Sequence, residues 1–480
     1  MSEHDQPDAG QPDTLVPARK MAPIPSLRPG SHERATERRR WALGLGAAGV
    51  ALVVIVVTAA LVAPRVHPGA TTRATGGANV AKTASAQAQQ GAGTEGPLMA
   101  VTMVSSTDGW AIGQQGQPDQ SGSQGPQGLL YHFDGSRWTL SQQAPAISLP
   151  GNGSPTIQMV SPTEGWILEG SSQVLRYDGT AWRPVTITPV GKAQIIQLLA
   201  IDMVSPTEGW AAARLTTSSP QGAFGFLRYD GKQWVVEPDA FALPGLDKNT
   251  VMISGISAAP GGDVWAVGVA TPYTTPGTTN NSQVGLIFQR VNSEWRLASQ
   301  LNRDAATTSF IPSDILMTGP TNGWIIGSSV QIQQSPNGAI ANSHALLLHY
   351  DFQQTGARWV PVAAPIANPT EGDQLNTIVA TGPGDIWVNG ITSGSTITAG
   401  LVINTLLLHY DGAHWTEMTP SFTALTGINT VSTFAIALAP DGTLWAAGGL
   451  EKGQDAQGAL HPFMCSFSGG VWSVESVAGA

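Results

Sequence analysis

The chain has 480 residues, which is enough for one large domain or two ordinary ones with a substantial core. Charged residues make up only 12% and glycine fills 56 positions, a balance that favours many short strands and turns over long helices. The single cysteine, Cys465, excludes an intrachain disulfide and a cysteine-based zinc cluster.

An apolar segment near the N-terminus predicts a membrane span. Residues 42–63 carry no charge, and at about 1.5 Å per residue a helix over them reaches roughly 33 Å, enough to cross a bilayer. Four arginines lie just before the segment and one just after it: Arg34, Arg38, Arg39 and Arg40, then Arg65. By the positive-inside rule we expect a transmembrane helix over residues 41–63, a signal anchor with the N-terminus in the cytoplasm and the rest of the chain outside. The alternative is a cleaved signal peptide, which the small residues of 58–63 would permit.

The segments on either side of this span lack the pattern of a folded domain. Residues 1–40 are rich in Pro, Asp, Glu and Arg and are expected to form a disordered cytoplasmic tail. Residues 64–96 consist largely of Ala, Thr, Gln and Gly, which predicts a low-complexity stalk. An external domain without disulfides is more typical of a bacterial surface protein than of a eukaryotic secreted one.

The charge of the exported part argues against nucleic-acid binding. Residues 1–63 hold 7 of the 23 basic and 6 of the 33 acidic residues, so the remainder has 16 basic and 27 acidic residues, a net charge of −11. Nothing in that part resembles a phosphate-binding face, so we expect no nucleic-acid partner.

Fourteen of the fifteen tryptophans fall into two alternating series of seven. The first series is Trp110, Trp166, Trp210, Trp265, Trp324, Trp387 and Trp445. The second series is Trp138, Trp182, Trp234, Trp295, Trp359, Trp415 and Trp472. The gap from a second-series tryptophan to the next first-series one is always between 28 and 31 residues. This regularity indicates an internal repeat.

Around the first series, apolar residues recur at fixed distances before the tryptophan. Nine residues earlier stand Val101, Ile157, Ile201, Ile256, Ile315, Ile378 and Ile436, and seven residues earlier stand Met103, Met159, Met203, Ala258, Met317, Ala380 and Leu438. A spacing of two predicts a strand, which ends in a turn of Pro, Gly and acidic residues before a second strand begins at the tryptophan.

Around the second series, the pattern LLxYDGxxW predicts a hairpin. A third strand runs into an Asp-Gly turn, whose residues both tolerate positive φ, and the tryptophan opens a fourth strand. Each repeat of about 55 residues is thus a four-stranded antiparallel sheet. We predict an all-β protein, a seven-bladed β-propeller over residues 97–478 that is preceded by one transmembrane helix, with the fourteen tryptophans packed between blades rather than serving as ligand platforms.

The stretch GGDVWAVG, followed by LLxYDGxxW, resembles the repeats of bacterial membrane-anchored propellers related to kelch, galactose-oxidase-like and photosystem-assembly-factor propellers. The resemblance covers residues 97–478 and implies the architecture, since such repeats carry unrelated activities. The chain departs from these families in three ways. No blade has the Asp-box S-x-D-x-G-x-T-W, blade four has RVN at Arg290–Asn292 in place of YDG, and blade seven has FSGG at Phe467–Gly470.

Ring closure can also be predicted. Because the repeat begins at strand one and ends at strand four, we expect Val101 to open the innermost strand of blade one and Val477 to lie near the end of the outermost strand of blade seven. The first and last blades would then meet through side-chain packing alone.

Candidate chemical residues have simpler structural interpretations. His132, His349 and His409 share one strand position with Arg176 and Arg228, and on three separate blades they should not converge on a metal. The acids two residues before the first-series tryptophans are interpreted as turn formers that accept backbone N–H groups: Asp108, Glu164, Glu208, Asp263 and Asp385. No motif for a catalytic nucleophile, a metal or a bound cofactor is present.

Loop lengths point to a functional face. The gap from first-series to second-series tryptophan varies from 16 to 35 residues, and most of the variation falls between strands two and three. These connections leave from the same side as the blade-to-blade connections, here called the loop face, while the short turns leave from the opposite side, the turn face. Variable loops on a rigid scaffold are where binding usually resides. The candidate binding residues lie in Gln114–Gln127 and Thr271–Gln283: Gln114, Gln117, Asp119, Gln120, Tyr273, Asn280, Asn281 and Gln283.

Two functions follow from this organisation. The first is a membrane-anchored, extracytoplasmic binding module that recognises a glycan, an envelope component or a protein. The alternative is an exported hydrolase or lyase acting on polysaccharide, which would require carboxylates about 5–10 Å apart in the funnel of the loop face. Such carboxylates would favour the enzyme and their absence would favour the binding module, and because they would come from several loops, the sequence alone does not show them.

Overall fold

A computed structural model of the chain describes the following residues: 95–115, 127–141, 147–149, 155–169, 174–185, 187–188, 194–216, 223–237, 249–259, 263–272, 283–301, 308–335, 338–351, 358–396, 400–426, 431–451 and 460–478. All of them belong to one compact unit. The expected tail, membrane span and all but the last two residues of the stalk lie outside these ranges. Within the ranges, no helix has the length and apolar character needed to cross a membrane.

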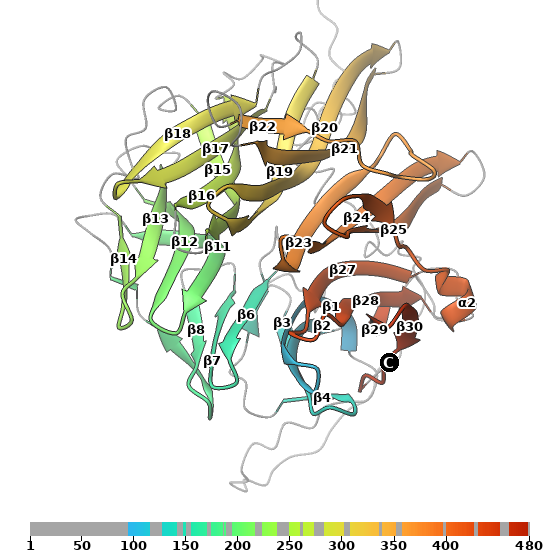
Figure 1. The fold of residues 1–480 in the computed structure, drawn as a ribbon, viewed down its shortest axis with the longest axis horizontal. Helices are drawn as coiled ribbons and strands as arrows, with labels where there is room; N and C mark the ends of the chain where they lie inside the picture. Colours follow the sequence, from blue (N-terminus) through green and yellow to red (C-terminus); the bar gives the residue numbers. More distant parts are fainter. Residues whose placement is uncertain are drawn as a thin grey trace, which may run out of the picture. The chain divides into compact units, whose positions relative to one another are not determined.

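The described strands form seven sheets, which confirms the predicted number of blades (Figure 1). Blade one consists of β1 (Glu95–Ser105), β2 (Asp108–Gln115), β3 (Gln127–Phe133) and β4 (Trp138–Leu140), with β5 (Ile147–Ser148) beside β3. Blade two consists of β6 (Thr156–Ser161), β7 (Glu164–Leu168), β8 (Val174–Tyr177) and β9 (Trp182–Val185). Blade three consists of β11 (Ile195–Ser205), β12 (Glu208–Leu215), β13 (Ala223–Tyr229) and β14 (Trp234–Val236), with β10 (Ile187–Thr188) beside β14.

The remaining four blades have the same order. Blade four consists of β15 (Asn249–Ala258), β16 (Val264–Pro272), β17 (Val284–Val291) and β18 (Glu294–Leu301). Blade five consists of β19 (Thr308–Gly319), β20 (Asn322–Ser335), β21 (Gly338–Asp351) and β22 (Arg358–Pro361). Blade six consists of β23 (Gln374–Gly382), β24 (Asp385–Thr396), β25 (Gly400–Tyr410) and β26 (Trp415–Glu417), followed by the short helix α2 (Phe422–Thr426). Blade seven consists of β27 (Val431–Leu438), β28 (Leu444–Glu451), β29 (Leu460–Ser468) and β30 (Val471–Val474).

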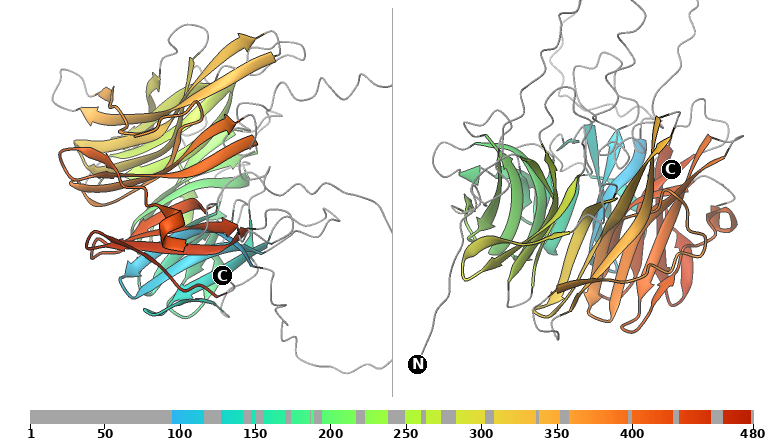
Figure 2. Two further views of the ribbon diagram at one scale, coloured as in Figure 1. Left: turned by 90° about the vertical axis from the view of Figure 1, so that its right-hand side faces the viewer. Right: turned by 90° about the horizontal axis from the view of Figure 1, so that it is seen from above.

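Each blade is antiparallel and is built from strands that are consecutive in the chain. The first strand of every blade contacts the first strand of the next, and β1 contacts both β6 and β27, so the sheets close into a ring around these inner strands (Figures 1 and 2). No strand is borrowed across the closure, as predicted.

The two tryptophan series meet between blades. In blades one to five the first-series tryptophan packs edge-on against the second-series tryptophan of the following blade, and Trp445 of blade seven packs against Trp138 of blade one, with ring centroids 5.1–6.3 Å apart. In blade six Trp387 meets Phe467 instead, at 5.4 Å. Eleven of the fourteen tryptophans are buried, which confirms their prediction as core residues. The three half-buried ones lie on outer strands: Trp359, Trp415 and Trp472.

A second repeated contact explains the residue that precedes the first-series tryptophan. In four blades this residue is glycine, and its cross-strand partner is the methionine seven positions before the tryptophan, as for Met203 and Gly209. A Cβ on Gly209 would lie 2.2 Å from the Met203 sulfur, so a larger residue there would require Met203 to move. Where the partner is alanine, the second residue is larger, as for Ala258 and Val264. In these blades a large residue on one strand faces a small one on the other, as close packing favours, while blade seven pairs Leu438 with Leu444.

The turns between strands three and four that the structure describes are of two kinds. In four blades the Asp-Gly turn has glycine alone at positive φ, between 85° and 94°, and its aspartate accepts backbone N–H groups two and three residues on. Of the two residues that tolerate positive φ, the glycine is thus the one that adopts it. In blades four and seven a two-residue hairpin replaces it, with both central residues at positive φ: Asn292 and Ser293, and Gly469 and Gly470.

The ring closes differently from the prediction. Strand β1 begins at Glu95, before Val101, and the last strand, β30, ends at Val474. Beyond it, Val477 forms a parallel bridge with Trp138 of blade one: the Trp138 N–H donates to the Ser476 carbonyl at 2.9 Å, and the Ala478 N–H donates to the Trp138 carbonyl at 3.0 Å. The side-chain packing that we expected between blades one and seven is present, but backbone hydrogen bonds add to it.

Candidate functional site

Only two of the eight candidate binding residues lie among the residues that the structure describes. Gln114 is half-buried near the end of β2, and Gln283 is buried just before β17, with its amide donating to Thr271 Oγ1 at 3.4 Å. The other six lie outside the described residues: Gln117, Asp119, Gln120, Tyr273, Asn280 and Asn281. The loop face itself carries two long hairpins, β20–β21 and β24–β25, because the extra residues of blades five and six extend the strands (Figure 1).

The acids before the first-series tryptophans have a role that the sequence analysis missed. Their carboxylates face the third strand, where the residue directly opposite the tryptophan bonds to them. His132 bonds to Asp108 at 2.9 Å, His409 to Asp385 at 2.8 Å and Gln289 to Asp263 at 2.6 Å. The interpretation of these acids as turn formers missed this bond, because strand register places the polar side chain opposite the tryptophan and within reach of the acid two residues before it. Asp385 also accepts a hydrogen bond of 2.6 Å from Thr381 across the turn.

The same two positions hold an arginine and a glutamate in blades two and three, but the two pairs differ. In blade two Arg176 makes a bidentate pair with Glu164, at 2.6 and 2.8 Å, and the Glu164 side chain is only 8% exposed. The hydrogen bonds that Arg176 donates to the Glu164 carboxylate raise the pKa of Arg176. In blade three a single contact of 3.7 Å joins Arg228 to Glu208, and both side chains are nearly half exposed, at 48% and 46%. Arg228 therefore occupies the same position as Arg176, but its carboxylate partner is held less tightly.

The junction between blades three and four also departs from the ring's pattern. At the other junctions the first-series tryptophan is covered by a tyrosine or phenylalanine of the next blade, with ring centroids 4.8–5.4 Å apart. At this junction that position holds Arg290, whose guanidinium lies 4.6 Å from the Trp210 ring and bonds through Nε to Glu237 at 2.9 Å. Arg228 lies 5.7 Å from the same ring. Trp210 is thus flanked by two guanidinium groups.

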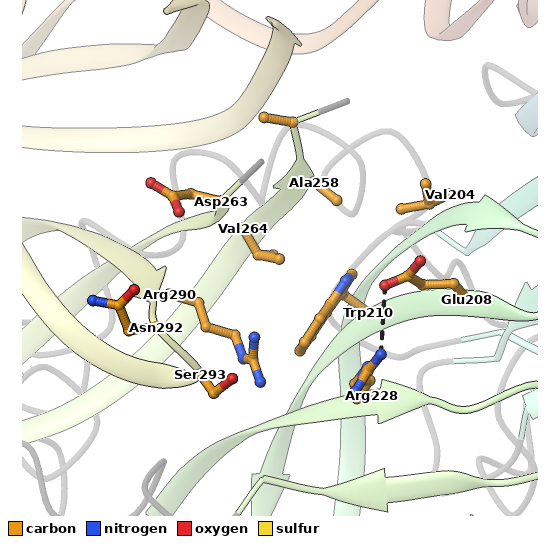
Figure 3. Close-up of a pocket in the computed structure, with 11 residues that line it drawn as sticks. Val204, Glu208, Trp210, Arg228, Ala258, Asp263, Val264, Arg290, Asn292 and Ser293 are labelled. Carbon is orange, nitrogen blue, oxygen red and sulfur yellow. Dashed lines mark ion pairs between the residues drawn. The ribbon is translucent and has the colours of Figure 1, made fainter. Parts of the chain in front are cut away.

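A polar cleft of about 380 Å³ lies at this junction, on the turn face (Figure 3). In addition to Trp210, four charged residues line it: Glu208, Arg228, Asp263 and Arg290. The rest of the lining consists of the small apolar residues Val204, Ala258, Ala259 and Val264 and of the turn residues Asn292 and Ser293. This volume is within the range of small-ligand sites. We call it the blade 3–4 cleft.

Backbone strain marks the same place. Asn292 and Ser293, at φ 52° and 71°, are the non-glycine residues with positive φ in the described part of the chain. Such backbone costs about 1–2 kcal/mol per residue and is often found at binding sites. Blade seven makes the equivalent hairpin with two glycines and keeps Phe467 against Trp387. The arginine, rather than the hairpin, therefore distinguishes the blade 3–4 cleft.

The cleft contains none of the candidate binding residues, although one sequence signal pointed to it. The replacement of YDG by RVN at Arg290–Asn292 was visible as a departure from the repeat. What the repeat could not show is that this arginine faces Trp210 and leaves Arg228 open, since both belong to the neighbouring blade.

Carboxylates also occur along the inner strands. Asp202 accepts the Ala258 N–H at 2.7 Å and the Gln158 amide at 3.3 Å, and Asp314 accepts the N–H groups of Ile315 and Ile378. The hydroxyl oxygens of Thr102 and Ser257 likewise accept a backbone N–H of the next blade, that of Met159 and that of Met317 respectively. Burial raises the pKa of Asp202, and it raises the pKa of Asp314 to about 7. These acids connect the inner strands of adjacent blades.

The raised pKa of Asp314 predicts a pH-dependent stability. An ordinary aspartate pKa of 3.8 in the unfolded chain and about 7 in the folded one mean that the folded state binds more protons between these values. The free energy of unfolding should therefore fall as pH rises from 4 to 7, by about 2–4 kcal/mol for this group. We expect Asp314→Asn to flatten this fall, measured by urea unfolding at several pH values. The exposed Glu294→Gln should leave it unchanged, and an identical pH profile for Asp314→Asn and the parent chain would contradict the assignment.

Comparison with known proteins gives similarity of fold. No protein-family model matches the sequence, and no curated protein matches it. Among solved structures, the chain is similar to YCF48 from Cyanidioschyzon merolae, at 14% identity and a TM-score of 0.41, over 78% of this chain and 96% of that one. It is also similar to an ulvan-cleaving polysaccharide lyase, at 10% identity and a TM-score of 0.49, over 82% and 97% of the two chains. A third is an α-L-arabinofuranosidase from Fusarium graminearum, at 10% identity and a TM-score of 0.38, over 65% and 92%.

Proposed function

We propose that this propeller is a binding module that holds its ligand in the blade 3–4 cleft and is tethered to a membrane through residues 41–63. The observation that carries the proposal is Arg290. It stands where the six other blades place a tyrosine or phenylalanine, so at this junction the Trp210 ring is flanked by the guanidinium groups of Arg290 and Arg228, which line the blade 3–4 cleft. A structural role alone would be served better by the tyrosine or phenylalanine of the other blades.

The charged side chains of the cleft suit recognition. Arg290 is fixed by Glu237, with both side chains about 15% exposed, so it forms a rigid wall. Arg228 and Glu208 are accessible and loosely paired, and can therefore exchange partners. A fixed Arg290 beside an Arg228 that can change its ion-pair partner favours binding, because little conformational entropy is lost when the ligand binds.

The loop face is a second contact surface in this proposal. The long hairpins of blades five and six extend from the side that also bears the candidate segments Gln114–Gln127 and Thr271–Gln283. A partner as large as a protein or an envelope polymer could reach this face while the stalk spans the distance to the membrane.

Catalysis on polysaccharide has less support in the described part of the chain. Both carboxylate oxygens of Asp202 accept hydrogen bonds from adjacent blades, and those of Asp314 accept the N–H of Ile315 in its own strand and that of Ile378 in the next blade. Glu208 and Asp263 are paired within their own blades. In the described ranges no group of three or more His, Cys, Asp or Glu side chains is arranged to hold a metal. A glycosidase needs two carboxylates that are free to face the substrate.

Filling the cleft tests the proposal. In Arg290→Tyr combined with Glu237→Gln, the tyrosine should cover Trp210 as in the other blades, and the second change avoids leaving a buried carboxylate unpaired. We expect this full-length variant, in nanodiscs, to keep its melting temperature and to lose about tenfold or more in affinity for ligands that the parent chain captures from glycan arrays and envelope extracts.

Two controls accompany this measurement. Arg183→Gln changes an arginine that is 65% exposed on blade two and should bind normally. A chain with residues 116–126 shortened tests the loop face separately. If binding survives closure of the cleft and disappears with the loop, the cleft is not the site.

The tether has its own test. Protease added to intact cells should digest the stalk between residues 71 and 96 and spare residues 1–40. A reporter fused after Ala480 that is active only in the cytoplasm would overturn the proposed topology.

A further inference from the structure

We infer that the blade 3–4 cleft binds an acidic segment of a protein, and that the ligand's carboxylate displaces Glu208 from Arg228. This inference rests on the proposed function and adds the chemical class of the ligand. It is drawn from the contrast between two arginine–glutamate pairs at equivalent positions in one chain.

The first step of the argument concerns the arginine. Arg176 and Arg228 both lie directly opposite a first-series tryptophan, with their guanidinium groups 5.5 and 5.7 Å from its ring. Arg176 has both ends of its fork occupied by Glu164, whereas Arg228 has one contact of 3.7 Å and a side chain that is 48% exposed. A guanidinium presents its fork to a carboxylate in one plane, and bidentate pairs of this kind are strong. Arg228 therefore offers a preformed carboxylate site that its own glutamate does not fill.

The second step concerns the other charges of the cleft. Arg290 is committed to Glu237, and Asp263 accepts a hydrogen bond of 2.6 Å from Gln289, which itself accepts one from Arg296. Glu208 is the exposed group that competes for Arg228. When a ligand carboxylate takes its place, the released Glu208 lies at the rim and can return to water at little cost, because exposed ion pairs contribute little to stability.

The third step concerns the uncharged lining. Val204 lines the cleft with Glu208 and is 47% exposed, whereas Val264 is only 4% exposed. No ring face is open, because Trp210 is only 3% exposed and two guanidinium groups cover it. An aspartate or glutamate next to an aliphatic side chain matches a carboxylate site beside an exposed valine. A uronic acid, the other common source of a carboxylate, has no aliphatic side chain to place there.

The experiment uses the full-length chain in nanodiscs and a library of random dodecapeptides displayed on phage. We expect selected peptides to contain Asp or Glu next to Val, Leu or Ile. Changing that acid to its amide in a synthetic peptide should weaken binding about tenfold or more, and Arg228→Gln should weaken the acidic peptide to the same degree. Combining the two changes should cost no more than either alone, because each removes the same contact.

Glu208→Gln gives the result that a merely structural pair would not. Removal of the competing carboxylate should strengthen binding of the acidic peptide about two- to fivefold, while Arg183→Gln on blade two should leave it unchanged. Weaker binding in Glu208→Gln, enrichment of basic peptides, or a selection that yields no acidic peptide would each overturn the inference. Binding of oligogalacturonate through Arg228 in place of peptides would assign the site to a glycan and also overturn it.

The outcomes separate this inference from the proposed function. If closing the cleft with Arg290→Tyr and Glu237→Gln abolishes binding but Arg228→Gln does not, the cleft remains the site and the ligand is not a carboxylate. If closing the cleft has no effect, the proposed function itself fails.

Discussion

Replacing Trp166 with alanine is expected to lower the free energy of unfolding by about 3–5 kcal/mol, the usual cost of removing a buried tryptophan. The Trp166 ring is fully buried and lies 5.5 Å from Trp234 and 4.8 Å from Tyr229, both in the next blade. Because Trp166 belongs to blade two and these neighbours belong to blade three, the cavity cannot collapse without moving one blade against the other. The loss should appear in urea unfolding followed by far-ultraviolet circular dichroism.

The matched comparison is Trp472, which occupies the second-series position of blade seven. It is half-buried on the outer strand β30, and its ring lies 4.9 Å from that of Phe467 in its own blade, with the ring planes tilted by 42°. Trp472→Ala should therefore cost about 1–2 kcal/mol, because less of its surface is removed from water on folding. Equal losses in the two variants would mean that contacts between blades do not dominate the stability of the ring.

Removal of residues 476–480 is expected to cost about 3.5–5 kcal/mol. Val477 is 7% exposed within the apolar cluster that joins blades one and seven, and its burial contributes about 1.5–3 kcal/mol. The two backbone hydrogen bonds with Trp138 add about 1 kcal/mol each. The two hydrogen bonds are the backbone connection between the first and last blades in the described part of the chain, and the Val477 side chain adds apolar packing to it.

Hydrogen exchange would locate the effect of this truncation. The Trp138 amide should lose its protection because its acceptor, the Ser476 carbonyl, is gone, while the Glu237 amide, which donates to the Phe226 carbonyl within blade three at 2.8 Å, should keep its own. Val477→Ala separates the side chain from the backbone and should cost less than the truncation. Val474→Ala, at a residue 47% exposed, is the control expected to cost least. A truncated chain as stable as this control would show that side-chain packing alone closes the ring.

The sequence by itself determined the blade, its number and its core. A strand, a turn and a tryptophan recur within a few residues of one another, so the information lies in local spacing and in turn residues such as the glycine of Asp-Gly. Even the alternation of Met203 with Gly209 and of Ala258 with Val264 is visible in the chain, because the two partners are always six residues apart. Patterns of this kind lie within one repeat, so they can be recognised without knowing how the blades are arranged.

The tertiary structure decided the contacts that depend on register and on the neighbouring blade. The acids before the first-series tryptophans pair across strands two and three, at separations of 12 to 26 residues that loop length disguises. Val477 meets Trp138 only because the ring closes. The blade 3–4 cleft likewise arises because Arg290 faces Trp210, 80 positions earlier in the chain, in place of an aromatic ring. A repeat shows which residue is unusual, but the chemistry of that residue is set by the side chains that the next blade brings to it.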